Sequence, residues 1–171
     1  MFLIQFRYLS FFFGIISILS FFNIIYSYYL NLYLNLNTYY YSFFLALMIS
    51  ILFYNIKIPQ KKISIFDKIL TVFLGYFILP LILSIPFYFS IYNLTFLNSY
   101  FESISGFTST GFSIFENIKH IDQSLILWRS STQWIGGLYF LFSIIFLIDI
   151  YDENFKKTLT NFISFDSSEA L

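Results

Sequence analysis

The residues best suited to chemistry are a run of small side chains from Thr108 to Gly111. Small residues let successive backbone carbonyls line a narrow path, and such a row of oxygens can replace the hydration shell of a cation. Gly111 also permits a positive φ, as a tight reversal of the chain requires. The composition of the run from Thr108 to Gly111 therefore fits coordination of a monovalent cation by main-chain oxygens. On composition alone, an ordinary connecting loop is the more common explanation of such a sequence.

A short helix is predicted immediately before this run, over residues 97–106. Ten helical residues extend roughly 15 Å, about half of a bilayer's hydrocarbon core. Such a helix cannot cross the membrane. It can enter from one side and return, provided that the non-helical return limb is buried in protein or lines water. Its C-terminal dipole would then favour a cation near the membrane middle.

The composition indicates a membrane protein. The 171 residues are 58% hydrophobic and only 11% charged, whereas a soluble domain carries about 25% charged residues. The nine basic and nine acidic residues cancel, which leaves no cationic field for nucleic acid. The chain has no Cys, so disulfides and Cys-ligated zinc are excluded. We therefore expect neither a soluble enzyme nor a nucleic-acid-binding protein.

Long runs without charge predict the membrane spans. The 49 residues between Arg7 and Lys57 carry no charged side chain, which is enough for two spans, near 8–30 and 39–56. A cleaved signal peptide is an alternative for the first span, but the apolar run is longer than a usual signal. The predicted segments are a transmembrane hairpin at 1–58, a basic loop at 59–68, a pore repeat at 69–150 containing helices at 69–89 and 123–149, and a cytoplasmic stub at 151–171.

Two prolines and the basic residues refine this topology. Pro80 and Pro86 fall within the predicted 69–89 helix, which indicates a bent helix packed against protein. Seven of the nine basic residues fall on one side of the predicted spans; only Lys119 and Arg129 fall on the other. The positive-inside rule therefore predicts that both termini are cytoplasmic.

The residues from Phe101 to Gly111 read FESISGFTSTG, and those from Leu127 to Gly137 read LWRSSTQWIGG. Together these two motifs resemble the first pore repeat of the TrkH/KtrB family of potassium-uptake proteins. The resemblance covers roughly residues 66–150, and the first two helices are similar only in number and placement to an extra pair in TrkH-like members. The resemblance implies an all-α integral membrane fold: two lead-in helices, then a potassium-channel-like unit of helix, re-entrant pore-loop and helix.

The same resemblance implies a function and a set of partners. The transported ion would be K⁺, with no organic cofactor and no enzymatic step. The family resemblance also implies a bacterial inner membrane location, contact with membrane lipid, a homodimer of four-repeat pores and a cytoplasmic nucleotide-binding regulator of the TrkA/KtrA type. Carried over by position, the ion-facing carbonyls are those of Thr108, Ser109, Thr110, Gly111 and Phe112, with K⁺ bound at Thr110 and Gly111.

One departure from the family pattern is large. Such a pore needs four repeats around an axis, and this sequence supplies one. Either four chains assemble, or the sequence is the front part of a longer or split protein. The second is favoured because the repeats of family members differ. The alternative from another functional class is a truncated or split non-conducting membrane fragment, or an interaction subunit.

Four further residues are predicted to support the pore. Glu102 within the half-length helix could attract cations, or it could pair with backbone N–H groups or Arg129; the second is favoured because an unpaired carboxylate there is costly. Gly136 and Gly137 indicate a close helix contact rather than a hinge, and Gly136→Ala is expected to be tolerated.

The sequence favours neither a metal site nor an enzyme active site. His120 and Asp122 are expected to be solvated rather than to bind a metal. The sequence contains no HExxH motif, Gly-rich phosphate loop or Cys nucleophile, so no enzyme activity is predicted.

Overall fold

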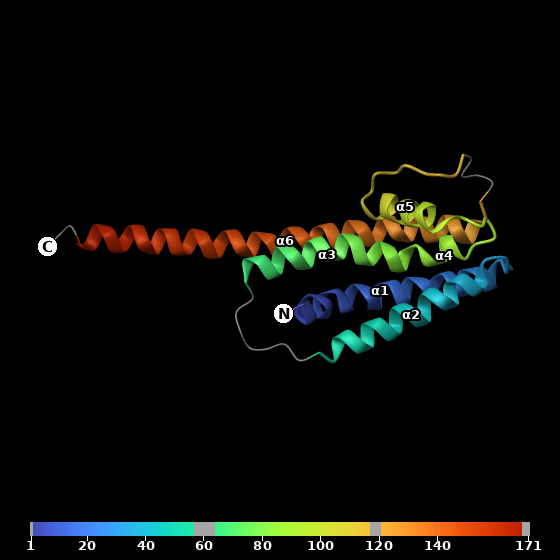
Figure 1. The fold of residues 1–171 in the computed structure, drawn as a ribbon, viewed down its shortest axis with the longest axis horizontal. Helices are drawn as coiled ribbons and strands as arrows, with labels where there is room; N and C mark the ends of the chain where they lie inside the picture. Colours follow the sequence, from blue (N-terminus) through green and yellow to red (C-terminus); the bar gives the residue numbers. More distant parts are fainter. Residues whose placement is uncertain (1, 57–63, 117–120, 169–171) are drawn as a thin grey trace.

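The computed structural model describes residues 2–56, 64–116 and 121–168 (Figure 1), and all regular secondary structure in these ranges is helical. The helices are α1 (Phe2–Tyr29), α2 (Leu36–Tyr54), α3 (Ile65–Leu83), α4 (Ile85–Tyr88), α5 (Phe96–Phe107) and α6 (Gln123–Ser168). Four stretches are long and apolar enough to cross a membrane: Phe6–Tyr29, Leu36–Tyr54, Ile65–Tyr88 and Gln123–Leu147. The prediction of an all-α chain with four spans is confirmed for the described residues.

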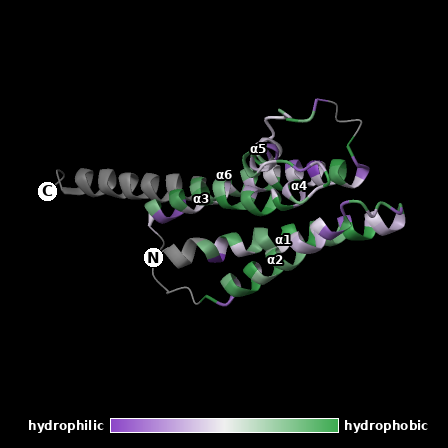
Figure 2. Ribbon diagram, turned by 45° about the vertical axis from the view of Figure 1, so that its right-hand side comes forward, coloured by the Kyte–Doolittle hydropathy of each residue, from purple (hydrophilic) through white to green (hydrophobic). Residues whose placement is uncertain are grey.

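The coloured parts of the four long helices consist mostly of hydrophobic residues, and hydrophilic residues gather toward helix ends and around α5 (Figure 2). Large apolar side chains lie exposed on every span, including Phe11, Phe44, Phe73 and Ile145. Water would disfavour so much exposed apolar surface, whereas lipid does not. The chain is a multi-pass membrane protein.

The first two helices form an antiparallel hairpin with a seam of small polar residues. The Ser20 hydroxyl donates to the Ile16 carbonyl at 2.9 Å and lies 3.1 Å from the Ser42 hydroxyl. Ser50 donates to the Ser10 carbonyl at 2.9 Å. Small residues let two helices approach closely in lipid, and the hydroxyls of Ser20 and Ser50 are satisfied by carbonyls. Two other buried polar atoms of α1, Asn23 Oδ1 and Ser27 Oγ, have no hydrogen-bond partner in the described ranges.

The third span is interrupted near its C-terminal end. A single bent helix was predicted over 69–89, and the structure instead has α3 and α4 separated by Ser84, whose φ and ψ remain helical (−75° and −16°). Pro80 inside α3 has no N–H to donate. Three carbonyls of this region accept side-chain hydrogen bonds from α5 and α6: Phe77 from Tyr100 at 3.2 Å, Pro80 from Ser103 at 2.8 Å and Leu83 from Trp128 at 3.0 Å.

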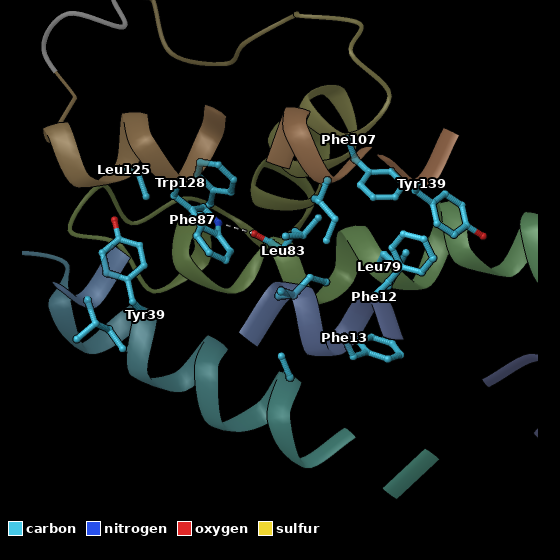
Figure 3. Packing of buried hydrophobic residues seen from close by; sticks show 14 of the residues in the cluster. Phe12, Phe13, Tyr39, Leu79, Leu83, Phe87, Phe107, Leu125, Trp128 and Tyr139 are labelled. Atoms are coloured by element: carbon cyan, nitrogen blue, oxygen red, sulfur yellow. Dashed lines mark hydrogen bonds between the residues drawn. The ribbon is translucent and has the colours of Figure 1, made fainter. Parts of the chain in front are cut away.

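Aromatic packing joins the hairpin to the rest of the chain. Tyr139 of α6 lies against Phe12 of α1 and Phe107 of α5 (Figure 3), with ring centroids 4.8 Å and 5.5 Å away. Its buried hydroxyl donates to the carbonyls of Thr71 and Val72 at 3.2 Å and 3.0 Å. A single side chain thus touches α1, α3 and α5, so the fold has one continuous core.

The hairpin turn is also tied to the start of α6. The Asn35 amide donates to the Asp122 carboxylate at 2.9 Å, and its oxygen accepts the Ile91 N–H at 3.1 Å. Tyr39 donates to Ser124 at 2.9 Å, and Ser124 donates to Asp122 at 2.6 Å. Polar residues therefore fix the hairpin against the pore-repeat segment at the same end of the molecule as α4.

The last helix is longer than predicted. The sequence predicted a helix at 123–149 and a separate stub at 151–171, but α6 runs without interruption to Ser168. Its 46 residues extend about 69 Å, more than twice a ~30 Å hydrocarbon core. The charged residues after 148 end the apolar span without breaking the helix, and the distal half projects beyond the other helices (Figure 1).

We predict that Trp128→Phe lowers the free energy of unfolding by about 1–3 kcal/mol, because it removes the hydrogen bond to Leu83 and buried ring volume. Trp134→Phe on the same helix is the matched control, since Trp134 is 59% exposed. Denaturant unfolding in detergent measures both variants. Equal stability of the two would show that the Trp128 contact does not hold the end of α3 against α6.

Candidate functional site

The segment after α5 reverses direction through two residues of positive φ, Ser109 at 56° and Gly111 at 83°. All five residues from 108 to 112 are exposed in this chain. Glycine adopts such a φ at no steric cost, whereas other residues pay roughly 1–2 kcal/mol. The strained Ser109 therefore needs support from its surroundings.

That support comes from the last turn of α5, which accepts the N–H groups of the segment. Thr108 and Ser109 donate to the carbonyls of Ile104 and Gly106 at 2.8 Å and 2.9 Å. Thr110 and Gly111 both donate to the Ser105 carbonyl, at 3.0 Å and 3.4 Å. Four successive N–H groups are thus turned toward the helix end.

The carbonyls of the segment divide into two groups. Gly111 and Phe112 each accept from Arg129 at 3.4 Å, and Phe112 also accepts from the Ser105 hydroxyl at 2.6 Å. The carbonyls of Thr108, Ser109 and Thr110 accept no hydrogen bond from any residue in the described ranges. Of the five residues predicted to face an ion, Phe112 is therefore the one whose carbonyl oxygen accepts the most hydrogen bonds from the protein.

Glu102 links α5 to the return limb and to α6. Its side chain is fully buried, and its carboxylate accepts from Arg129 Nε at 2.5 Å, from the Ser113 hydroxyl at 3.1 Å and from the Ile114 N–H at 3.0 Å. A buried carboxylate is stable only when it is paired and hydrogen-bonded. The structure thus has the pairing that the sequence analysis favoured over a free carboxylate.

Arg129 completes this cluster from the first half of α6. Its Nε bonds to Glu102, while its Nη2 reaches the carbonyls of Gly111 and Phe112. The planar guanidinium can hold several acceptors at once. One side chain therefore fixes the end of the exposed segment relative to both helices, and its charge is balanced by Glu102.

Close contacts at two glycines fix the position of α5 against α6. A Cβ added at Gly136 would lie 1.8 Å from the Phe107 carbonyl oxygen, and one added at Gly106 would lie 2.2 Å from Thr132 Oγ1. A Cβ at Gly137 would meet nothing within 4 Å in this chain. The close contact predicted for the glycine pair thus belongs to Gly136. The expectation that Gly136→Ala is tolerated is wrong, because the clash is with main chain.

A cavity of about 420 Å³ lies beside the end of α5. Its lining residues are Tyr76, Phe107, Thr108, Ser109, Gly136, Gly137 and Phe140. The absence of a side chain at Gly137 keeps this space open next to Thr108 and Ser109. It is therefore continuous with the segment whose carbonyls are unpaired.

Sequence reasoning missed four residues of the site: Ser105, Gly106, Ser113 and Thr132. Each acts through a partner that only the folded chain brings close, as Ser113 does with Glu102 and Gly106 with Thr132. The small residues at 105 and 106, one turn after Glu102, were the available signal. Their roles depend on the helix contact, which spacing along the chain does not encode.

A metal site at His120 and Asp122 has no support among the described residues. His120 and Lys119 lie outside them. The Asp122 carboxylate bonds to Asn35 and Ser124, and no group of three or more His, Cys, Asp or Glu side chains suited to a metal occurs among the described residues.

The chain is similar in sequence to known potassium-uptake proteins and to a cation transporter. A Trk system potassium uptake protein TrkH of Salmonella typhimurium is 32% identical over 99 residues, which are 57% of this chain and 20% of that protein. TrkI of Halomonas elongata is 40% identical over 60 residues, 35% of this chain and 11% of that protein. An uncharacterized cation transporter of Methanocaldococcus jannaschii is 30% identical over 132 residues, 73% of this chain and 27% of that protein.

The chain is a relative of the Trk potassium-uptake proteins. It spans about a quarter or less of the length of these relatives. They are transporters and not enzymes, in agreement with the absence of a catalytic motif. No family model matches the chain, and no solved structure matches it.

For this Trk relative we predict strong coupling between Glu102 and Arg129. Either Glu102→Gln or Arg129→Gln alone leaves a buried charge without its partner and lowers the free energy of unfolding by about 3–5 kcal/mol. The double variant loses clearly less than the sum, because neither charge remains. Denaturant unfolding in detergent measures the cycle, with the exposed Glu116→Gln as control. Additive losses would contradict direct pairing.

A second prediction concerns the glycine pair. Gly136→Ala should shift α5 away from α6 and destabilise the protein by at least about 1–3 kcal/mol, as expected for overpacking against main chain. Gly137→Ala should leave stability within about 0.5 kcal/mol. Thermal unfolding in detergent compares the two. Similar melting temperatures would mean that α5 does not lie against Gly136.

Proposed function

We propose that this chain contributes a pore-forming segment to a potassium-uptake protein of the Trk type. In this proposal α3 with α4, α5 and α6 form one helix, pore-loop, helix unit, and the segment 108–112 forms its part of the selectivity filter. The observation that carries the proposal is the exposed segment itself: its N–H groups are used by α5, while three successive carbonyls carry no donor in the described ranges.

The depth of α5 supports a re-entrant arrangement. Its 12 residues extend about 18 Å. Its end, Phe107, contacts Gly136, which lies 13 residues into the candidate span that begins at Gln123. In a helix that distance is about 20 Å, beyond the middle of a ~30 Å core. We propose that α5 enters from the α4 end and that the following segment returns toward the same side.

The chemistry proposed is solvation of K⁺ by backbone oxygens, with no covalent step. Thr108, Ser109, Thr110 and Gly111 are the proposed ion-facing residues, with K⁺ bound at Thr110 and Gly111. Phe112 would anchor the segment, because its carbonyl accepts the 2.6 Å bond from Ser105 as well as one from Arg129, whereas that of Gly111 has only the 3.4 Å bond from Arg129. The C-terminal dipole of α5 would favour a cation beside its end.

The Glu102–Arg129 pair is compatible with a cation path beside it. Arg129 lies close to the filter segment, and an isolated positive charge there would oppose a passing cation. Its pairing with buried Glu102 makes the cluster neutral. Ions would move down the inward electrochemical gradient, in which each charge gains about 2.3 kcal/mol per 100 mV.

Further pore repeats would complete the path, either in the same longer chain or in associated chains. By resemblance to the Trk proteins, the complete assembly would be a homodimer of four-repeat pores with a TrkA/KtrA-type regulator on the cytoplasmic side. We also propose a bacterial inner membrane location with both termini cytoplasmic. The concentration of basic residues at the Arg7 end of the spans supports this orientation.

Potassium uptake in a host lacking its own uptake systems tests the proposal, with the chain expressed together with any adjacent reading frame that supplies further repeats. Gly111→Ala places a Cβ at φ 83° and displaces the segment's carbonyls. We expect rescue of growth at low K⁺ by the unmodified chain and at least tenfold slower K⁺ uptake with Gly111→Ala.

Asn93→Ala is the matched control, since Asn93 is an exposed loop residue with φ 48° and lies outside the site. An alanine at position 93 would be held at a positive φ, as an alanine at position 111 would be, but it should leave K⁺ uptake unchanged. Uptake by Gly111→Ala equal to that of the control, at equal expression, would refute the filter assignment.

A further inference from the structure

A second site lies at the Arg7 end of the molecule, away from α5. A groove of about 710 Å³ opens between α1, α2 and α6. It is lined mainly by apolar side chains, among them Phe11, Ile18 and Phe142, with Arg7 and Tyr54 at its end. None of these residues belongs to the candidate ion path, so the groove needs a separate explanation.

Arg7 is held in place with donors to spare. Its Nη1 donates to the Ile56 carbonyl at 2.6 Å, and its guanidinium lies 5.8 Å from the centre of the Tyr54 ring. A guanidinium has five N–H donors, and in the described ranges this is the one hydrogen bond that the Arg7 guanidinium donates. An orientated guanidinium with free donors is well suited to bind a phosphate in bidentate geometry.

The groove has the length of one lipid leaflet. From Arg7 to Ile18 it follows α1 for 11 residues, about 16 Å, which is half of a ~30 Å hydrocarbon core. Phe11 and Ile18 are 65% and 55% exposed along it. Gly14 lines the groove between these two residues and has no side chain to fill it. An acyl chain whose headgroup lies at Arg7 would fit this length.

The charge at this end favours an anionic lipid. The first 66 residues contain no Asp or Glu, and their basic residues are Arg7, Lys57, Lys61 and Lys62. The first turn of α3, which follows, adds one charge of each sign, Asp67 and Lys68. Basic residues beside a span attract anionic headgroups. Tyr8 and Tyr54 line the same end of the groove, and tyrosine favours the headgroup level.

We propose that this groove binds an anionic phospholipid, with its phosphate at Arg7 and one acyl chain along Phe11 and Ile18. The proposal depends on the chain lying in a membrane and not on ion conduction. It assigns the lead-in hairpin a lipid-binding role in addition to packing against the pore repeat.

Native mass spectrometry of the full chain in detergent tests this, with equimolar dioleoyl phosphatidylglycerol and dioleoyl phosphatidylcholine added. We expect the unmodified chain to retain phosphatidylglycerol preferentially. Arg7→Gln should weaken its binding about fivefold, the effect of one basic residue at a membrane surface, and Arg7→Lys should keep most of the preference. Equal retention of the two lipids by the unmodified chain would overturn the proposal.

Ile18→Trp tests the acyl-chain part by filling the groove. It should lower binding of phosphatidylglycerol, whereas Ile25→Trp, at a 48% exposed position of α1 outside the groove, should not. Equal binding by both variants would contradict the proposal. A concentration-dependent dimer of the lipid-free chain that Ile18→Trp abolishes would also contradict it, since a second copy would then occupy the groove.

A stability measurement on the unmodified chain keeps the test independent of how the variants fold. Saturable thermal stabilisation by phosphatidylglycerol, and not by phosphatidylcholine, is expected. The same shift with both lipids would overturn the assignment of Arg7 as a phosphate ligand.

Discussion

The buried carboxylate of Glu102 is the constraint on which the arrangement around α5 depends. An uncompensated charge at a fully buried position would unfold this part of the chain or force protonation. Arg129 from α6 and the backbone and hydroxyl donors at 113 and 114 remove that cost together. Because these partners come from two segments outside α5, satisfying one side chain determines where α5, its return limb and α6 lie relative to each other.

The same rule governs the backbone of the interrupted third span. In lipid, polar main-chain groups need partners within the protein, and α3 contains a proline that donates no hydrogen bond. Side chains from α5 and α6 bond to carbonyls at 77, 80 and 83. The break near Ser84 and the position of α5 are therefore linked: the half-length helix lies where the third span offers carbonyls, and the span bends where α5 and α6 provide donors.

The sequence predicted those features that depend on local composition. Charge-free runs of about 20 residues indicated the spans, and the short helix before Thr108 was visible because a polar, glycine-containing segment follows it. The sequence did not predict the continuation of α6 to Ser168, since charged residues end an apolar span without ending a helix. It also did not predict the contact of Gly136 with Phe107 or the roles of Ser105 and Thr132, because these depend on how closely two helices approach.

The division of the carbonyls in 108–112 could not be predicted either, and it bears on what the segment can do. A row of five equivalent oxygens would need all five to be free of internal donors. Here Ser105 and Arg129 hold the end of the segment at Phe112, while the N–H groups from 108 to 111 are held by the last turn of α5. Fixing both ends leaves the carbonyl oxygens of Thr108, Ser109 and Thr110 orientated, with no donor to them in the described ranges. Such an arrangement can exchange water for an ion with little rearrangement of the protein.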